Sequence, residues 1–294
     1  MKKFVPFVFL FLTFSSSLTF GQIEDRFSYL LEEDVKEYAQ PLATAAGVAF
    51  NSGTFYTAKV PRLFGFSLSV RGMLVMVPDD DLTFKPNLPE GYSSEKETAT
   101  IFGDKGAAYT GADGYLVYPP GINESNLPMV FPQASVSFMG SEVMLRYLPK
   151  IDIGETDLSL FGFGLKHSIS QYIPLSPVDL AVQFLYNSFT MTDVVDVTNT
   201  AFNVQVSKSF GLFTAYGGLQ YESTSFDLEY TYVNHNSSDI FNEFDGETIK
   251  VNLDGENNFR ATIGGSAKFV FLVLNAGYSI GKHSVLSSGL TLEF

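Results

Sequence analysis

Serine and histidine side chains stand next to each other at two places, His167–Ser168 and His283–Ser284. A hydrolytic Ser–His pair on a β-strand needs both side chains on one face, which a His-x-Ser spacing provides because side chains alternate along a strand. Directly adjacent residues point to opposite faces, and the residue two positions after each histidine is apolar. We therefore interpret both pairs as polar residues of turns or strand ends, and we rank an enzyme below the other function classes.

Other residue types that bind metals or cofactors are scarce. The chain has no Cys and 3 His, which excludes a disulfide framework, an iron–sulfur cluster and a thiolate nucleophile, and argues against a His-rich metal site. Asp79–Asp81 offers oxygen ligands of the kind Ca²⁺ prefers, but it lacks the ligand spacing and glycine of an EF-hand loop, so we favour a solvated loop. We expect no metal and no cofactor. A net charge of −14 without a basic run also argues against a nucleic-acid partner.

The N-terminal segment, residues 1–21, is predicted to be a secretory signal peptide. Lys2 and Lys3 precede an apolar run from Phe4 to Phe14, and a Ser-rich stretch leads to small Gly21. Without this segment, 16 of the 18 Lys and Arg remain against all 32 Asp and Glu, so the mature chain is strongly acidic. The sequence after it contains no apolar stretch long enough for a membrane-spanning helix. These features indicate an exported protein of the periplasm, the cell exterior or the outer membrane.

Residues 22–62 are predicted to form an amphipathic helix and a linker. Apolar residues recur at steps of three and four from Ile23 to Ala45, which is one face of a helix that ends near Gly47. The opposite face is acidic rather than basic, so packing on a core is favoured over lying on a membrane surface. The residues expected to form the buried face are Phe27, Leu31, Val35, Tyr38 and Leu42.

From residue 63 to residue 294 the apolar period changes from 3.6 to 2, which predicts β-strands with one apolar and one polar face. Long acidic connections at 78–130 and 234–246 alternate with brief ones such as Gly140–Ser141, as in outer-membrane barrels with short turns on one side and long loops on the other. We predict an all-β, antiparallel transmembrane β-barrel of ten to twelve strands. The expected strands are 63–77, 131–139, 142–150, 157–167, 179–190, 200–208, 211–233, 247–269, 271–281 and 284–294.

The last strand carries the most specific signal. Ser287, Gly289, Leu292 and the terminal Phe294 fit a polar-x-Gly-x-x-apolar-x-aromatic ending, which resembles the outer-membrane assembly signal of Gram-negative barrels. The expected partners are therefore outer-membrane lipids and the barrel assembly machinery. Six phenylalanines should form an interfacial girdle at the short-turn side, namely Phe64, Phe210, Phe213, Phe269, Phe271 and Phe294.

Three segments also carry a family resemblance: Asn51–Lys59 (NSGTFYTAK), Met144–Lys150 (MLRYLPK) and Gly164–Pro174 (GLKHSISQYIP). They resemble a domain-of-unknown-function family of exported Gram-negative proteins predicted to be outer-membrane barrels. The resemblance covers most of the mature chain and implies a fold and a location. It implies no activity and no catalytic residues. In outline, a helix followed by a barrel also resembles long-chain fatty-acid transporters, although this barrel is smaller.

Three arginines, Arg71, Arg146 and Arg260, lie on the polar side of their alternating segments and should point into the lumen. A buried charge there must meet a carboxylate or a ligand, and Glu293 is a candidate partner. An internal salt-bridge network is one interpretation, and selection of an anionic or amphipathic small molecule by the guanidinium groups is the other. Our first hypothesis is a channel or transporter plugged by the helix, which would lie in the lumen or at its periplasmic mouth with Glu32, Glu33 or Glu37 near these arginines. A non-transporting structural protein that displays acidic loops is the alternative, and a lipid-modifying enzyme is third.

Overall fold

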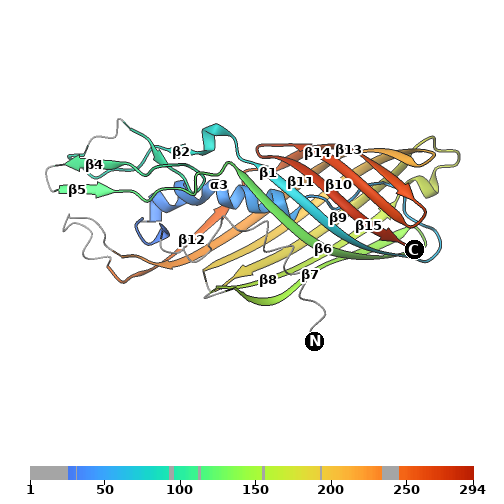
Figure 1. The fold of residues 1–294 in the computed structure, drawn as a ribbon, viewed down its shortest axis with the longest axis horizontal. Helices are drawn as coiled ribbons and strands as arrows, with labels where there is room; N and C mark the ends of the chain where they lie inside the picture. Colours follow the sequence, from blue (N-terminus) through green and yellow to red (C-terminus); the bar gives the residue numbers. More distant parts are fainter. Residues whose placement is uncertain are drawn as a thin grey trace.

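A computed structural model describes residues 26–30, 32–92, 96–111, 114–153, 156–192, 194–233 and 245–294. The predicted signal peptide, Leu31 and residues 234–244 of the second acidic connection lie outside these ranges. The described chain is a β-barrel that continues at one end into a body built around a helix (Figure 1). No helix in the described ranges is both long and apolar enough to cross a membrane.

The elements follow one another in a simple order, with one helix before the barrel and most strands after it. They are α3 (Glu32–Phe50), β1 (Gly65–Met76), η1 (Asp79–Asp81), β2 (Thr83–Phe84), β3 (Thr98–Ala99), β4 (Ala108–Gly111), β5 (Gly114–Val117), β6 (Asn126–Phe138), β7 (Ser141–Ile153), β8 (Thr156–Ser168), η2 (Ser170–Tyr172), β9 (Asp179–Met191), β10 (Val195–Phe210), β11 (Phe213–Thr231), β12 (Thr248–Asp254), β13 (Phe259–Phe269), β14 (Leu272–Ile280) and β15 (Ser284–Glu293).

Ten of these strands close into an antiparallel barrel. Their order is β10-β9-β8-β7-β6-β1-β15-β14-β13-β11, and a further pairing of β10 with β11 closes the ring. The predicted fold class and number of strands are therefore confirmed. The predicted strand 247–269 is wrong in one respect, because it is interrupted: β13 pairs with the first half of β11, and β12 pairs with its second half as an eleventh strand outside the ring.

The interruption lies where the helix enters the barrel. Between β12 and β13, the Gln40 side chain of α3 donates to the backbone oxygen of Asp254 at 2.8 Å, and the Glu256 backbone N–H donates to Thr44 Oγ1 at 3.2 Å. The chain thus leaves the sheet edge to bond to α3. Beyond this point α3 packs against β12.

The connections are less regular than the sequence suggested. At the end that holds the C-terminus, which we call the short-turn end, the connection between β8 and β9 spans residues 169–178 and includes η2. At the opposite, long-loop end, only the connections after β1 and after β11 are long, and those after β7, β9 and β14 are short. The segment 77–125 is also not a plain surface loop. It carries the hairpins β2–β3 and β4–β5, and its side chains Phe84, Ile101 and Phe102 are buried in the core.

The polarity of the barrel wall inverts part-way along the strands. In the lower half of β10, toward the short-turn end, Phe202, Val204 and Val206 face outward while Asn203, Gln205 and Ser207 are buried inside. In its upper half the order is reversed, because Val195 and Val197 point inward while Asp196 and Thr198 are exposed. The lower half therefore has the apolar exterior of a membrane barrel over about nine residues, and the upper half has the polar exterior of a protein in water.

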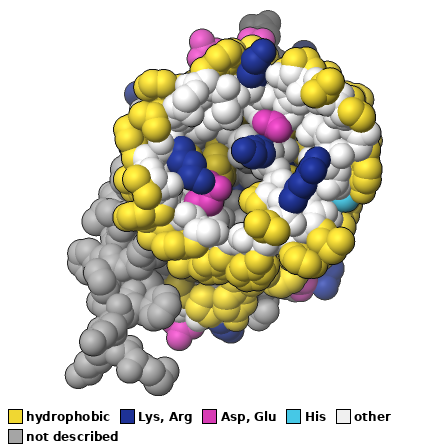
Figure 2. Space-filling model, turned by 90° about the vertical axis from the view of Figure 1, so that its right-hand side faces the viewer, with side chains coloured by type: hydrophobic (Ala, Val, Ile, Leu, Met, Phe, Trp, Pro, Cys, Tyr) yellow, Lys and Arg dark blue, Asp and Glu magenta, His cyan; other side chains and the backbone are white. Residues whose placement is uncertain are grey.

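Viewed from the short-turn end, a rim of hydrophobic side chains surrounds an interior that contains Lys, Arg, Asp and Glu (Figure 2). Every phenylalanine of the predicted girdle is exposed, and the rings of Phe271 and Phe294 stack with centroids 6.3 Å apart. A second group of outward aromatic residues, which includes Tyr221 and Phe259 with ring centroids 5.1 Å apart, lies where the wall polarity inverts. Two aromatic belts that border an apolar band are the pattern of a membrane-spanning barrel.

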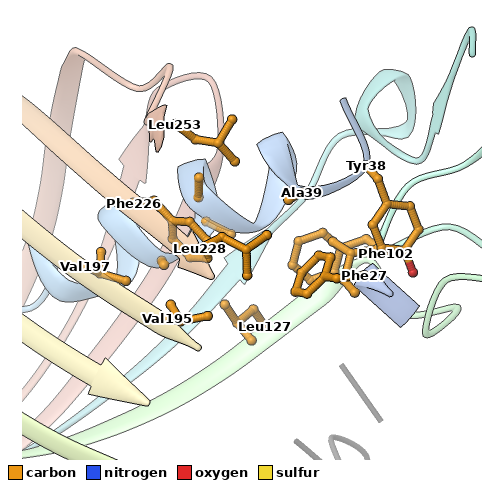
Figure 3. Close-up of a cluster of buried hydrophobic side chains, with 14 of the residues drawn as sticks. Phe27, Tyr38, Ala39, Phe102, Leu127, Val195, Val197, Phe226, Leu228 and Leu253 are labelled. Carbon is orange, nitrogen blue, oxygen red and sulfur yellow. The ribbon is translucent and has the colours of Figure 1, made fainter. Parts of the chain in front are cut away.

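The main hydrophobic core lies in the upper half, around α3 (Figure 3). Val195, Val197, Phe226 and Leu228 point inward from β10 and β11, and Leu253 does so from β12. From α3 itself Val35, Tyr38 and Ala39 are fully buried, and Phe27 packs edge-on to Tyr38 just before the helix. Burial of each large apolar side chain contributes about 1.5–3 kcal/mol, so this core holds the helix in place.

Candidate functional site in the barrel lumen

The chain passes through the lumen of its own barrel. The helix α3 lies at the long-loop end, whereas Pro61 lies at the short-turn end, where its carbonyl accepts the Gly140 N–H at 3.1 Å. Residues 51–60 connect the two ends. Lys166 Nζ donates to the Thr57 carbonyl at 2.6 Å, and Thr57 Oγ1 lies 3.1 Å from Ser207 Oγ. We call residues 47–60 the lumen segment.

The structure places α3 at the long-loop end, with its first turns in the body and its last turns inside the barrel, where Gly47 meets Thr224 of β11. We predicted the lumen or its periplasmic, short-turn mouth, and of these two positions the short-turn mouth is wrong. The reason is the inversion of wall polarity, since only the upper interior is apolar enough to bury the stripe. Val35 and Tyr38 are fully buried there, Leu42 packs partly buried against the same core, and Leu31 lies outside the described residues.

Two of the predicted arginines hold the C-terminal end of α3. Arg146 donates from Nη1 to the Phe50 carbonyl at 2.8 Å and from Nη2 to the Ser52 carbonyl at 2.7 Å. Arg260 donates from Nη1 to the Val48 carbonyl at 3.0 Å. A helix ends with unpaired carbonyls and a partial negative charge, and α3 has no basic residue in its last turn. The barrel wall supplies the missing positive charge.

Arg260 is the only one of the three with a carboxylate in contact among the described residues. Its Nη2 lies 2.7 Å from Glu222 Oε2, and both side chains are almost completely buried. Gln220 and Asn257 donate to the two oxygens of Glu222. A buried ion pair needs such additional hydrogen bonds to offset its desolvation.

Arg71 has a different environment. Its Nη1 donates to Asn275 Oδ1 at 2.5 Å, its guanidinium carbon lies 4.8 Å from the centre of the Tyr56 ring, and its Nε has no hydrogen-bond partner. A Cβ added to Gly289 would lie 2.4 Å from Arg71 Nη1, so this glycine of the terminal strand makes room for the guanidinium. A buried cation without a carboxylate in contact is costly, so Arg71 is a candidate functional residue.

The predicted ion pair between Glu293 and an arginine is not present. Glu293 instead lies 3.0 Å from Lys268 Nζ and accepts a hydrogen bond from the Tyr56 hydroxyl at 3.3 Å. Of the two interpretations of the arginines, the salt-bridge network therefore applies to Arg260 alone. Arg146 and Arg71 bind carbonyl and amide oxygens and aromatic rings.

Sequence reasoning missed several lumen residues. Lys166 is a fourth buried cation, and amide side chains form a network, in which Asn203 Nδ2 donates to Gln220 Oε1 at 3.1 Å and Gln205 Nε2 donates to Gln183 Oε1 at 2.7 Å. The alternation of polar and apolar residues could have identified them, because they continue the polar face of their strands. Their packing against one another depends on the barrel register.

The lumen segment fills the space. Two cavities beside residues 51–57 measure ≈ 10 and ≈ 30 Å³, and a larger one of ≈ 360 Å³ lies at the short-turn rim beside Lys59 and Val60. Gly47 permits the close approach, since a Cβ there would lie 2.0 Å from Thr224 Oγ1 of β11. Residues 47–58 carry no charged side chain, and four buried cations and the buried Glu222 surround them. Glu142 and Glu293, which are partly buried, line the same lumen toward the short-turn end.

The other residues named from sequence lie in β15 and in η1. Ser287 and Gly289 point into the lumen, Ser287 Oγ donates to the Gly277 carbonyl at 3.2 Å, and Leu292 pairs with Leu68 and Leu272 as β15 joins β1 to β14. The acidic triplet Asp79–Asp81 forms η1, in which Asp81 bonds to His283 at 2.7 Å. The described ranges contain no group of three or more His, Cys, Asp or Glu side chains placed to hold a metal ion.

A cleft lies at the long-loop end. It measures ≈ 670 Å³ and is lined by the start of α3, the β11–β12 hairpin and the segment around Asn87 and Tyr118. Asp34 at its wall accepts the Asn87 N–H at 2.9 Å and the Tyr118 hydroxyl at 2.7 Å. Burial nevertheless raises the pKa of the Asp34 carboxyl above its ordinary value.

The whole chain, residues 1–294, matches the Family of unknown function (DUF6588). The chain belongs to this family. The resemblance inferred from the three sequence segments is thereby confirmed. A search of curated protein sequences found no match.

Several solved structures are similar at low identity. The translocator domain of the autotransporter NalP from Neisseria meningitidis is 10% identical, with 91% of this chain and 99% of that one covered and a TM-score of 0.29. The toluene transporter TbuX from Ralstonia pickettii is 8% identical over 81% and 90%, with a TM-score of 0.27. OmpF of Salmonella typhi, solved with daunomycin, is 9% identical over 78% and 97%, with a TM-score of 0.24. All three likenesses are distant, and none assigns a function to this chain.

Proposed function

We propose that this protein is an outer-membrane channel for a small anionic molecule, held closed by the lumen segment. The observation that carries the proposal is a mismatch in charge between the side chains of the barrel wall and the residues that fill the lumen. Arg71, Arg146, Arg260 and Lys166 face the lumen against one buried carboxylate, Glu222, and two partly buried ones, Glu142 and Glu293. The space between them is filled by residues 47–58, which carry no charged side chain, rather than by side chains of the wall.

The chemistry of the contacts supports an anionic solute. Arg146 and Lys166 bind backbone carbonyls of the lumen segment, which carry only partial negative charge. A carboxylate or phosphate forms shorter and about twice as strong hydrogen bonds with a guanidinium, often two in parallel. If the segment leaves, the same cations form a positively charged path, and rings of Arg or Lys select anions in pores.

Residence in the outer membrane is part of the proposal. It is supported by the apolar exterior of the lower half, by the two aromatic belts and by the terminal strand from Ser287 to Phe294. Outer-membrane lipids would cover the exterior, and the barrel assembly machinery would read the terminal strand. By the usual orientation of such barrels, the short turns face the periplasm and the body around α3 faces outward.

A second candidate function is a surface body without transport, anchored by a filled barrel. The small residual cavities favour it, as does the hydrophobic core of the body, which keeps α3 from moving as a unit. The two candidates differ in one respect, which is whether residues 51–60 can leave the lumen while the barrel stays intact.

A reversible tether tests this difference. Because the chain has no Cys, Thr57→Cys with Ser207→Cys introduces one pair across the lumen segment and the wall, at positions whose oxygens are 3.1 Å apart. Ser67→Cys with Ser135→Cys is the matched control, because these residues pair across β1 and β6 with oxygens 2.7 Å apart and leave the segment free. Both proteins are inserted into planar bilayers, and single-channel currents are recorded before and after dithiothreitol.

For a channel, the oxidised Thr57–Ser207 protein should be silent and reduction should restore the openings of the wild type, while the control conducts in both states. The reversal potential in a KCl gradient should show preference for chloride. Absence of openings in the reduced protein and in the wild type, with gel mobility showing a folded barrel, would establish the non-transporting alternative.

A further inference from the structure

A serine and a histidine that are distant in sequence meet near the short-turn end. Ser141 opens β7, His167 lies near the end of β8, and the two are register partners. Ser141 Oγ lies 2.8 Å from His167 Nδ1. The second ring nitrogen, Nε2, lies 3.0 Å from the Tyr172 hydroxyl and 3.0 Å from Gln171 Nε2. A nucleophile, a base and groups that orient the base are therefore in mutual contact.

The pair faces the lipid side of the wall. Ser141 shares its face with Val143, and His167 shares its face with Leu165, and these two neighbours are 45% and 46% exposed. Phe138 and Met139, at the adjacent turn, are exposed as well. The pair thus lies at the border of the apolar band, which is the depth of the ester bonds between the acyl chains and the glycerol of phospholipids.

We propose that Ser141 and His167 form a hydrolytic site for the acyl esters of membrane phospholipids, independent of the channel. In the tautomer with its hydrogen on Nε2, His167 donates to the Tyr172 hydroxyl and accepts the Ser141 hydroxyl hydrogen at Nδ1. This assigns Ser141 as nucleophile, His167 as general base, and Tyr172 as the positioning residue.

The reaction balances with water as the only other reactant. Ser141 Oγ bonds to the ester carbonyl carbon while its proton moves to Nδ1, and the bond from that carbon to the glycerol oxygen breaks as His167 returns the proton to this oxygen. Water then attacks the acyl-serine, gives one proton to Nδ1 and releases the fatty acid, and Ser141 recovers the proton. The exposed Arg62 donates to the Gln171 carbonyl at 3.4 Å and lies on the same rim, where it can bind the lipid phosphate.

A fluorophosphonate probe tests the site, because it reacts with activated serine hydroxyls. The folded full-length protein in phosphatidylethanolamine vesicles is labelled, the adduct is located by mass spectrometry, and release of fatty acid and lysophospholipid is measured in parallel. We expect the adduct on Ser141, its loss in Ser141→Ala, and a decrease in lipid hydrolysis of about 100-fold or more in His167→Gln. Ser209→Ala is the matched control, since this serine lies at the same rim but bonds to Thr214 instead of an imidazole.

Mapping the adduct in the wild type does not depend on the folding of any variant. An adduct on a different serine, or no adduct on a barrel whose gel mobility shows that it is folded, would overturn the proposal. An adduct on Ser141 without product release would overturn the assignment of phospholipid esters. Channel currents do not enter either readout, so the two proposals stand or fail separately.

Discussion

The inversion of wall polarity along β10 predicts opposite effects of one substitution at two outward positions. Val206 lies four residues from both Phe202 and Phe210, which border the apolar band on this strand. At about 3.3 Å per residue and a tilt of about 40°, Val206 is about 10 Å from each border, near the midplane. Val206→Arg should therefore destabilise the inserted barrel by about 2–4 kcal/mol.

Thr198→Arg is the matched control, because Thr198 is outward on the same strand and about 10 Å beyond the band on the polar side. Its cost should be close to zero. The assay is urea-dependent folding into phosphatidylcholine vesicles, in which the folded fraction is read from the gel mobility of the unheated protein. The equilibrium constant for folding should fall roughly 30- to 800-fold for Val206→Arg and stay unchanged for Thr198→Arg. Equal costs at both positions would refute the assignment of the lower half to the membrane.

Three further predictions concern the lumen and the body above it. Gly289→Ala should destabilise the barrel by about 1–3 kcal/mol in the same folding assay, because its Cβ would overlap the Arg71 guanidinium. Gly265→Ala is the control and should be neutral, because its Cβ would lie 3.8 Å from the Thr214 carbonyl oxygen, which is an ordinary contact distance. Arg146→Gln should make channel openings more frequent in planar bilayers, because it removes two bonds to the lumen segment; unchanged opening frequency would mean that Arg146 does not hold the closed state. Burial raises the pKa of Asp34 in the folded state, so its contribution to the stability of the body is fully present below the ordinary pKa of 3.8 and is lost as pH rises through the raised value. Hydrogen exchange of α3 should therefore become faster over this pH range, and Asp34→Asn should abolish the pH dependence.

Much of the barrel follows from local pattern. The period of 2 places nine of the ten predicted strands onto β1, β6–β11, β14 and β15, because alternation is a property of the strand itself. The tenth fails at Gly255–Asn258, where contact with α3 interrupts the strand, and a contact between distant elements leaves no periodic signature. The small residues of the last half of α3 are compatible with a narrow passage, but nothing in their spacing says which end of the barrel the helix occupies.

The lumen contacts show the same limit. Arg71, Arg146 and Arg260 could be assigned to the inside from alternation alone. Their partners could not, because Arg146 meets the Phe50 and Ser52 carbonyls only when the chain threads the barrel. Backbone carbonyls are the same in every residue, so a sequence does not distinguish the ones that will bind an arginine.

The sequence by itself determined the strand faces, the acidic composition and the terminal strand, because these depend on residue type and short spacing. The tertiary structure alone decided which residues meet across strands and through the lumen. Ser141 and His167 are 26 positions apart, and only the register of β7 on β8 places their side chains in contact. A search for a Ser–His pair along one strand misses them, because register is set by turns and by the packing of the whole barrel.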